Sequence, residues 1–170
     1  TAEAMGMITS GIDIVRRLNQ RIDDLKIETS KIERRPKVAC IEWTSPLMAA
    51  GNWVPELVSA AGGENLFGAM GTHSPYLSWS DLIDAAPDII IAMPCGFDLA
   101  RTRIEIAPLL ALPDWPRLSA VQSGAVYITD GNQYFNRPGP RIIESAEILA
   151  EILHPEHFSF GHRGVGWEKL

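Results

Sequence analysis

The sequence lacks the features that mark several special classes of protein. Only two of its 170 residues are cysteines, which is too few to specify a disulfide framework. It contains no run of about 18 consecutive apolar residues, so we expect no membrane insertion. Its first residues form neither a basic start nor an apolar stretch, and we therefore expect no signal peptide in this chain.

Positive charge is also scarce. The 15 Lys and Arg residues are outnumbered by 21 Asp and Glu residues, which gives a net charge of −6 and a pI near 5.2. A protein that binds the phosphate backbone of a nucleic acid needs a basic surface, so no nucleic-acid partner is expected. The hydrophobic share of 46% and the charged share of 21% are typical of a globular domain with a core. No G-x-S-x-G, P-loop or G-x-G-x-x-G motif is present.

The chain opens with a long stretch of helical periodicity. Within residues 4–32, one apolar stripe contains Ile8, Ile12, Val15, Ile22 and Leu25. A helix of about 28 residues is about 42 Å long, which exceeds the width of a small domain. Two interpretations fit this pattern: a coiled-coil arm, or a spine that joins two lobes. We expect the helical segment to occupy residues 1–35 and to end at Pro36.

Strand-like and helical segments then alternate. We expect strands at 37–43, 65–67, 88–93 and 125–129, and helices at 54–61, from Ser78 onward, at 99–110, at 117–122 and from Pro140 to 153. This alternation predicts an α/β fold, in which residues 36–154 form a mostly parallel sheet with helices on both faces. Residues 155–170 are expected to form a tail that lies loosely on the surface.

Ligands of such sheets bind beyond the carboxyl ends of the strands. The loops expected at that edge hold unusually many large aromatic and polar side chains. The candidate ligand-binding residues are Trp43, His73, Ser74, Tyr76, Cys95, Phe97, Asn132, Tyr134, Phe135 and Arg137. Such a set suits a flat, bulky ligand with an amide fringe. The alternative is that the aromatic residues form a satellite core under long loops.

Catalysis and metal binding have weaker support. Cys95 and His73 could form a thiol–imidazole pair, but Cys95 does not begin a helix that would lower its pKa, so we expect no catalytic residue. His73 is expected to hydrogen-bond a ligand amide, with axial ligation of cobalt or iron as the alternative. His154, His157 and His162 lack a partner at ligand spacing, and we expect no metal site.

Several runs resemble the helical-backbone class of ABC-transporter substrate-binding proteins. They are AGGENLF (61–67), LSWSDL (77–82) and APDIII (86–91). The segments IAMPCGFDLART (91–102) and VYITDGNQYFNRPGPR (126–141) are most similar to the cobalamin (vitamin B12) branch of that class. The resemblance covers nearly the whole chain.

This resemblance implies two α/β lobes joined by one long helix, with the ligand clamped between them. The chain would then be one Rossmann-like lobe, the C-terminal one, preceded by the interlobe helix. It would capture cobalamin or a related corrinoid in the periplasm or another extracytoplasmic compartment and pass it to an ABC permease, with no cofactor beyond the transported ligand. A ferric siderophore or haem is the alternative ligand, and a Cys95-dependent or corrinoid-modifying enzyme is the alternative activity.

The class usually carries a Glu that docks onto the transporter near the start of the helix that begins here at Ser78. This sequence has Ser80 at that position, with Asp81 beside it. We also expect the isolated lobe to self-associate through its exposed aromatic edge.

Overall fold

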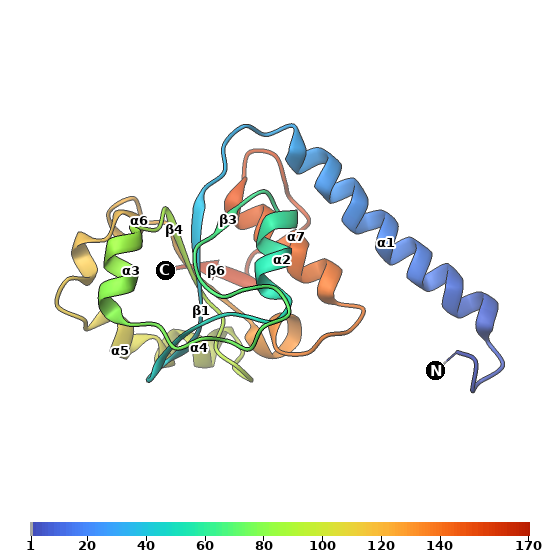
Figure 1. Cartoon of the computed structure of the whole chain (residues 1–170), viewed down its shortest axis with the longest axis horizontal. Helices are drawn as coiled ribbons and strands as arrows, with labels where there is room; N and C mark the ends of the chain where they lie inside the picture. The colour runs from blue at the N-terminus through green and yellow to red at the C-terminus, as the bar shows by residue number, and fades with distance from the viewer. Residues whose placement is uncertain (1) are drawn as a thin grey trace.

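The computed structural model describes residues 2–170, which form a mixed β-sheet flanked by helices, with one long helix at the N-terminal end (Figure 1). The strands are β1 (Lys37–Thr44), β2 (Leu47–Ala49), β3 (Glu64–Asn65), β4 (Ile89–Ala92), β5 (Val126–Thr129) and β6 (Trp167–Lys169). The α-helices are α1 (Ile8–Ser30), α2 (Val54–Ala60), α3 (Trp79–Ala85), α4 (Leu99–Glu105), α5 (Ala107–Leu110), α6 (Ser119–Gln122) and α7 (Ile142–Leu153). Two further short helices are η1 (Trp115–Arg117) and the π-helical η2 (Gly131–Phe135).

The sheet has six strands in the order β2-β1-β4-β5-β6, with β3 beside β1. The pairs β1–β3, β1–β4 and β4–β5 are parallel, whereas β2 and β6 pair antiparallel at the edges. The central strands are continuous apolar runs because both of their faces are buried. The expected α/β fold with a mostly parallel sheet is therefore confirmed.

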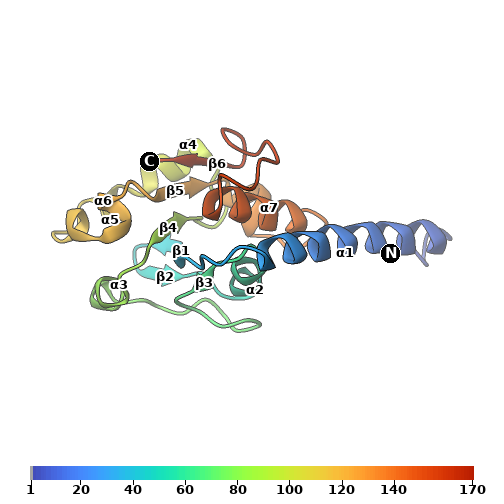
Figure 2. The same cartoon turned by 90° about the horizontal axis from the view of Figure 1, so that it is seen from above.

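Alternate residues of β1 enter two separate cores. Val38 and Cys40 pack with α2 and α7, while Ala39 and Ile41 pack on the opposite face with α3, α5 and α6. The turned view shows the two helical layers on either side of the sheet (Figure 2). The helix expected from Ser78 begins with a capping box, in which the side chains of Ser78 and Asp81 each accept from the other's backbone N–H.

The long helix α1 packs on the lobe through its C-terminal half only. Leu25 and Thr29 are buried, and the Thr29 hydroxyl donates to the Ala60 carbonyl at 3.0 Å. Most of the expected apolar stripe toward the N-terminus, including Ile8 and Val15, is exposed. In Figure 1 this half extends away from the lobe, toward the level of the carboxyl ends of β1 and β4. Among residues 2–170, none of the helices combines the length and the apolar character that a membrane span requires.

Three expectations from the sequence are wrong. The first helix ends at Ser30, well before Pro36, and the helix expected over 99–110 is interrupted at Ile106. Pro108, which has no N–H, lies in the first turn of the new helix α5. The C-terminal segment is not a loose tail, because β6 pairs with β5 and the Trp167 side chain is buried.

Candidate ligand-binding site

The carboxyl end of β1 carries a bulge between Ile41 and Trp43. Beyond it Trp43 pairs with Met48 of β2, and Met48 forms an antiparallel bridge with Tyr76. Directly opposed residues of antiparallel neighbours project on the same side, so these three side chains form a row along the edge. Tyr76 is 76% exposed. The bulge thus changes the direction of the Trp43 side chain at the carboxyl end of β1, since a bulge can re-aim the side chain beside it.

Trp43 contacts Phe97 from the loop after β4. Their ring centroids are 5.4 Å apart at an interplanar angle of 42°. Arg101 covers the Phe97 ring, with 5.5 Å between its Cζ atom and the ring centroid, and it also pairs with Glu105. The two rings form a half-buried surface, here called the aromatic shelf (Trp43 and Phe97). The two loops meet at one edge of the sheet, as expected from the sequence.

Glu42, which was not among the predicted residues, joins the loops next to this shelf. Its Oε2 atom accepts the Ser74 hydroxyl at 2.6 Å, and its Oε1 atom accepts the Cys95 thiol at 3.4 Å. The Ser74 Oγ atom in turn accepts the Gly51 N–H at 3.1 Å. Ser74 is buried, so it shapes the edge from below and does not present its hydroxyl to a ligand. The feature of the sequence that could have identified Glu42 is its position as a carboxylate at the end of the apolar run of β1.

Cys95 is exposed, but its thiol is not activated. Burial of the sulfur, then the charge of Glu42 and the hydrogen bond to it, raise the pKa of Cys95 to about 11. A thiol with that pKa is almost wholly protonated near neutral pH and is a poor nucleophile. His73 is exposed, and its Nδ1 atom lies 3.0 Å from the Ser74 carbonyl. The structure therefore brings Cys95 to Glu42 and does not show the thiol–imidazole pair considered from the sequence.

The loop after β5 meets the same edge through its backbone. The Asn132 N–H donates to the Phe97 carbonyl at 3.1 Å. The Gly96 N–H donates to the side chain of Asn136, which ties the loops after β4 and β5 together a second time. These two contacts fix the loop after β5 against the aromatic shelf. Asn132 and Arg137 are exposed on this loop.

Two predicted site residues of this loop do not reach the edge. Tyr134 is 8% exposed and Phe135 is 3% exposed, and both belong to the core that contains α7. The π-helical turn η2 directs their rings inward, and the Ser145 hydroxyl donates to the Tyr134 carbonyl. The expectation that these rings line a ligand site is therefore wrong. For these two residues the satellite-core interpretation holds.

The remaining candidates are spread over the lobe. Ser80 and Asp81 are exposed on α3, where the Asp81 side chain also accepts the Ser78 N–H at 3.2 Å. His154 is buried against the Gly62 carbonyl, which lies 3.3 Å from its Nε2 atom. Within residues 2–170, no three His, Cys, Asp or Glu side chains gather closely enough to hold a metal ion.

Comparison with known proteins identifies the family. The sequence profile described as periplasmic binding protein matches residues 1–133. The chain belongs to the periplasmic binding protein family. A sequence comparison with curated proteins found no match.

Solved structures share the fold of this periplasmic binding protein chain at low sequence identity. An ABC transporter substrate-binding protein from Listeria monocytogenes EGD-e matches with a TM-score of 0.78 and 20% identity over 91% of this chain and 60% of its own. IsdE from S. aureus, complexed with heme, matches with a TM-score of 0.77 and 18% identity over 90% of this chain and 60% of its own. The periplasmic heme-binding protein RhuT from Roseiflexus sp. RS-1 matches with a TM-score of 0.73 and 20% identity over 91% of this chain and 59% of its own. The chain thus spans about 60% of the length of these structures.

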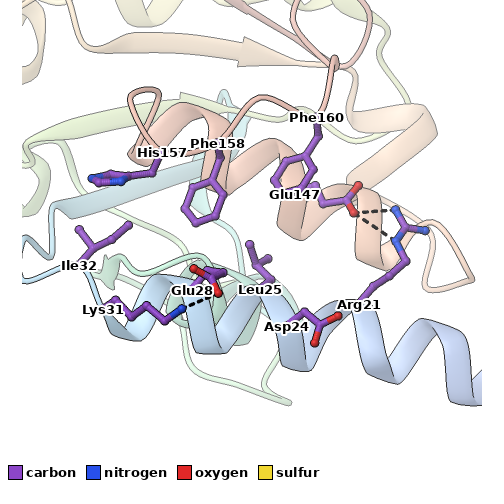
Figure 3. Close-up of a pocket in the computed structure, with 10 residues that line it drawn as sticks. All are labelled: Arg21, Asp24, Leu25, Glu28, Lys31, Ile32, Glu147, His157, Phe158 and Phe160. Atoms are coloured by element: carbon purple, nitrogen blue, oxygen red, sulfur yellow. Dashed lines mark hydrogen bonds and ion pairs between the residues drawn. The ribbon is translucent and has the colours of Figure 1, made fainter.

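This periplasmic binding protein chain also has a cavity, which lies away from the aromatic shelf. A cavity of about 540 Å³ lies between α1, α7 and the segment that follows α7. Figure 3 shows the rings of Phe158 and Phe160 facing α1 across it, with Arg21 and Glu147 joined at one end. Nothing in the sequence indicates this cavity, because it depends on the docked position of the C-terminal segment.

Proposed function

We propose that this chain is the C-terminal lobe and connecting helix of a two-lobed substrate-binding protein, which captures a corrinoid and delivers it to an ABC permease. The aromatic shelf at the carboxyl edge of the sheet is the observation that carries the proposal. Trp43 and Phe97 offer a half-buried apolar surface for a flat macrocycle. Exposed Tyr76, Asn132 and Arg137 lie on loops of the same edge and supply polar contacts for its periphery.

The charge of the edge supports a neutral, amide-rich ligand over an anionic one. Glu42 has no Lys, Arg or His within ion-pair distance in the described part of the chain, so its negative charge is not neutralised locally. Arg101 is already paired with Glu105. The amide groups of a corrinoid can donate hydrogen bonds near Glu42, whereas the carboxylates of haem and the anionic oxygens of a ferric siderophore are repelled by it.

Haem remains the second candidate, because two of the similar structures are of proteins whose names state that they bind or contain heme. Its flat ring would use the same aromatic shelf, and Arg137 would be the cation available in this loop for one propionate. A Cys95-dependent enzyme has less support, since the pKa of Cys95 is raised to about 11.

Direct titration of the two-lobed protein tests this proposal. Cyanocobalamin, dicyanocobinamide, haem and a ferric tris-catecholate would each be titrated by calorimetry. We expect saturable binding of the two corrinoids, and a loss of roughly tenfold or more in affinity for Trp43→Ala or Phe97→Ala. Phe160→Ala is the control, because this exposed aromatic residue lies at the cavity beside α1, away from the shelf. Binding of haem alone favours the second candidate, and no binding of any ligand refutes the proposal.

Glu42→Gln separates the ligand classes further. Removing the charge while keeping the shape is expected to strengthen binding of haem and the ferric catecholate relative to the corrinoids. An unchanged ratio of these affinities would contradict the electrostatic part of the argument.

We also propose that α3 docks onto the permease outside the cytoplasmic membrane, through exposed Ser80 and Asp81. In a transport assay, Asp81→Asn is expected to reduce uptake without changing ligand affinity. Asp84→Asn is the matched control, because Asp84 is an exposed acid of the same helix. Equal uptake by the two variants would remove Asp81 from the docking surface.

A further inference from the structure

One ion pair joins α1 to the lobe, in addition to the hydrogen bond from Thr29 to Ala60. The Arg21 Nε and Nη2 atoms of α1 both donate to Oε1 of Glu147 on α7, at 3.2 and 2.6 Å (Figure 3). The other ion pairs of α1 join neighbours in sequence, as Arg16 does with Asp13 at 2.7 Å and Lys31 with Glu28 at 2.6 Å. Arg21 therefore differs from them in joining α1 to a helix far away in the sequence.

Glu147 also holds the segment that follows α7. Its Oε2 atom lies 3.2 Å from the Nε2 atom of His162, and the side chains of His162 and Glu147 are only 16% and 11% exposed. The backbone N–H of His162 donates at 3.3 Å to Glu151, one helical turn after Glu147. Glu147 thus connects α1, α7 and the C-terminal segment at one point. We call Arg21, Glu147 and His162 the Glu147 bridge.

Apolar packing leaves α1 poorly restrained beside this bridge. The cavity of about 540 Å³ separates α1 from Phe158 and Phe160, so side chains do not fill the space across which the helix could tilt. The fully buried residues of α1 are Leu25 and Thr29, and the partly buried Ile22 packs against the same core. Contacts confined to the short segment from Ile22 to Thr29 fix the position of a long helix better than its angle. The Glu147 bridge adds a polar attachment at the N-terminal end of this segment, about one turn before Leu25.

We propose that Arg21, Glu147 and His162 are positioning residues, which set the angle of α1 to this lobe and thereby the placement of a second lobe over the aromatic shelf. The functional part of this inference rests on the proposed two-lobed capture of a ligand. A helix held at a fixed angle reduces the conformational entropy lost when two lobes close on a ligand. Loss of the bridge weakens binding without altering any residue of the shelf.

The angle of α1 can be measured directly on this chain. Spin labels at Ser10→Cys on α1 and Gln122→Cys on α6, both exposed positions, report the distance between helix and lobe by pulsed electron resonance. A Cys95→Ser background removes the exposed native thiol, while Cys40 is buried. We expect Arg21→Ala and Glu147→Gln to broaden the distance distribution, and Arg21→Lys to broaden it less. Arg16→Ala, which breaks a pair within α1, is the matched control and should leave it unchanged.

Ligand dissociation from the two-lobed protein then tests the functional part. We expect Arg21→Ala to release the ligand about fivefold faster than wild type, the effect of losing roughly one partly buried ion pair. Arg16→Ala should release it at the wild-type rate. An unchanged distance distribution in Arg21→Ala overturns the positioning role, and a broadened distribution with unchanged dissociation overturns its link to ligand capture. Absence of ligand binding by the wild-type protein would instead refute the proposed function, while the distance measurement still decides the positioning role.

Discussion

Glu151 is the residue whose replacement tests the docking of the C-terminal segment most directly. It is 4% exposed on α7, and its Oε1 atom accepts the backbone N–H groups of Phe160, Gly161 and His162. Its Oε2 atom accepts the indole N–H of Trp167 at 2.6 Å. Glu151→Gln keeps the shape of the side chain, removes its charge and replaces one acceptor oxygen with an NH₂ group.

The expected loss of stability follows from these contacts. If the amide oxygen stays with the backbone N–H groups, the new NH₂ group faces the Trp167 indole N–H, so two donors oppose each other. A hydrogen bond to a charged group contributes about 1.5–3 kcal/mol, and an orphaned buried donor costs about 1–3 kcal/mol. Because the segment can detach and let its donors reach water, we expect a total loss of about 3 kcal/mol, or a fall in Tm of about 6–12 °C.

Urea unfolding and a double-mutant cycle would measure this loss. Trp167→Phe removes the indole N–H, so it should cost less in the Glu151→Gln background than alone, with a coupling energy of about 1–2 kcal/mol. Exposed Glu156 lies near the same segment, and Glu156→Gln should change stability by less than about 0.5 kcal/mol. Wild-type stability of Glu151→Gln, or an equal cost of Trp167→Phe in both backgrounds, would refute the reasoning.

Other predictions concern His154 beside Gly62 and the thiol at the sheet edge. Burial is the main cause that lowers the pKa of His154, so the unfolded chain binds more protons, and stability should fall as the pH drops below the ordinary value of 6.5. Urea midpoints measured between about pH 7.5 and about pH 5 should show a shallower fall for His154→Gln, and equal slopes would contradict this. Gly62→Ala should destabilise by about 1–3 kcal/mol in the same assay, because Gly62 has φ +86° and a Cβ there would lie 2.8 Å from the His154 Nε2 atom; wild-type stability would count against it. Iodoacetamide should alkylate Cys95 slowly near neutral pH and faster in Glu42→Gln, since Glu42 helps to raise the pKa of Cys95 to about 11; equal rates would exclude that coupling.

The central strands could be predicted because burial on both faces leaves a clear mark on the sequence. β4 and β5 lie within the expected segments 88–93 and 125–129, and β1 extends the expected 37–43 by one residue. The loops at their carboxyl ends could be placed as well, since parallel strands end at one edge. Trp43 and Phe97, which follow β1 and β4, accordingly lie in contact.

The direction of a loop side chain could not be predicted in the same way. Tyr134 and Phe135 follow β5 just as Phe97 follows β4, yet they are buried. The difference comes from the π-helical turn η2, whose geometry has no signature in composition or spacing. β6 was missed for a related reason, because its short sequence WEK has no apolar alternation and its strand depends on pairing with β5 and on the bond from Trp167 to Glu151.

The carboxylates that organise this lobe share a signal that a search for catalytic motifs does not detect. Glu42 ends the apolar run of β1, and Glu147 and Glu151 are one turn apart in the apolar helix α7. A charged group in such surroundings is costly unless it is paired or hydrogen-bonded, so each one implies a partner from elsewhere in the fold. Here Glu42 joins the loops at the carboxyl edge of the sheet, Glu147 joins α1 to the lobe, and Glu151 holds the C-terminal segment. Acidic residues inside apolar runs therefore mark the contacts that shape this lobe, and Glu42 and Glu147 are also the two for which we propose a part in ligand capture.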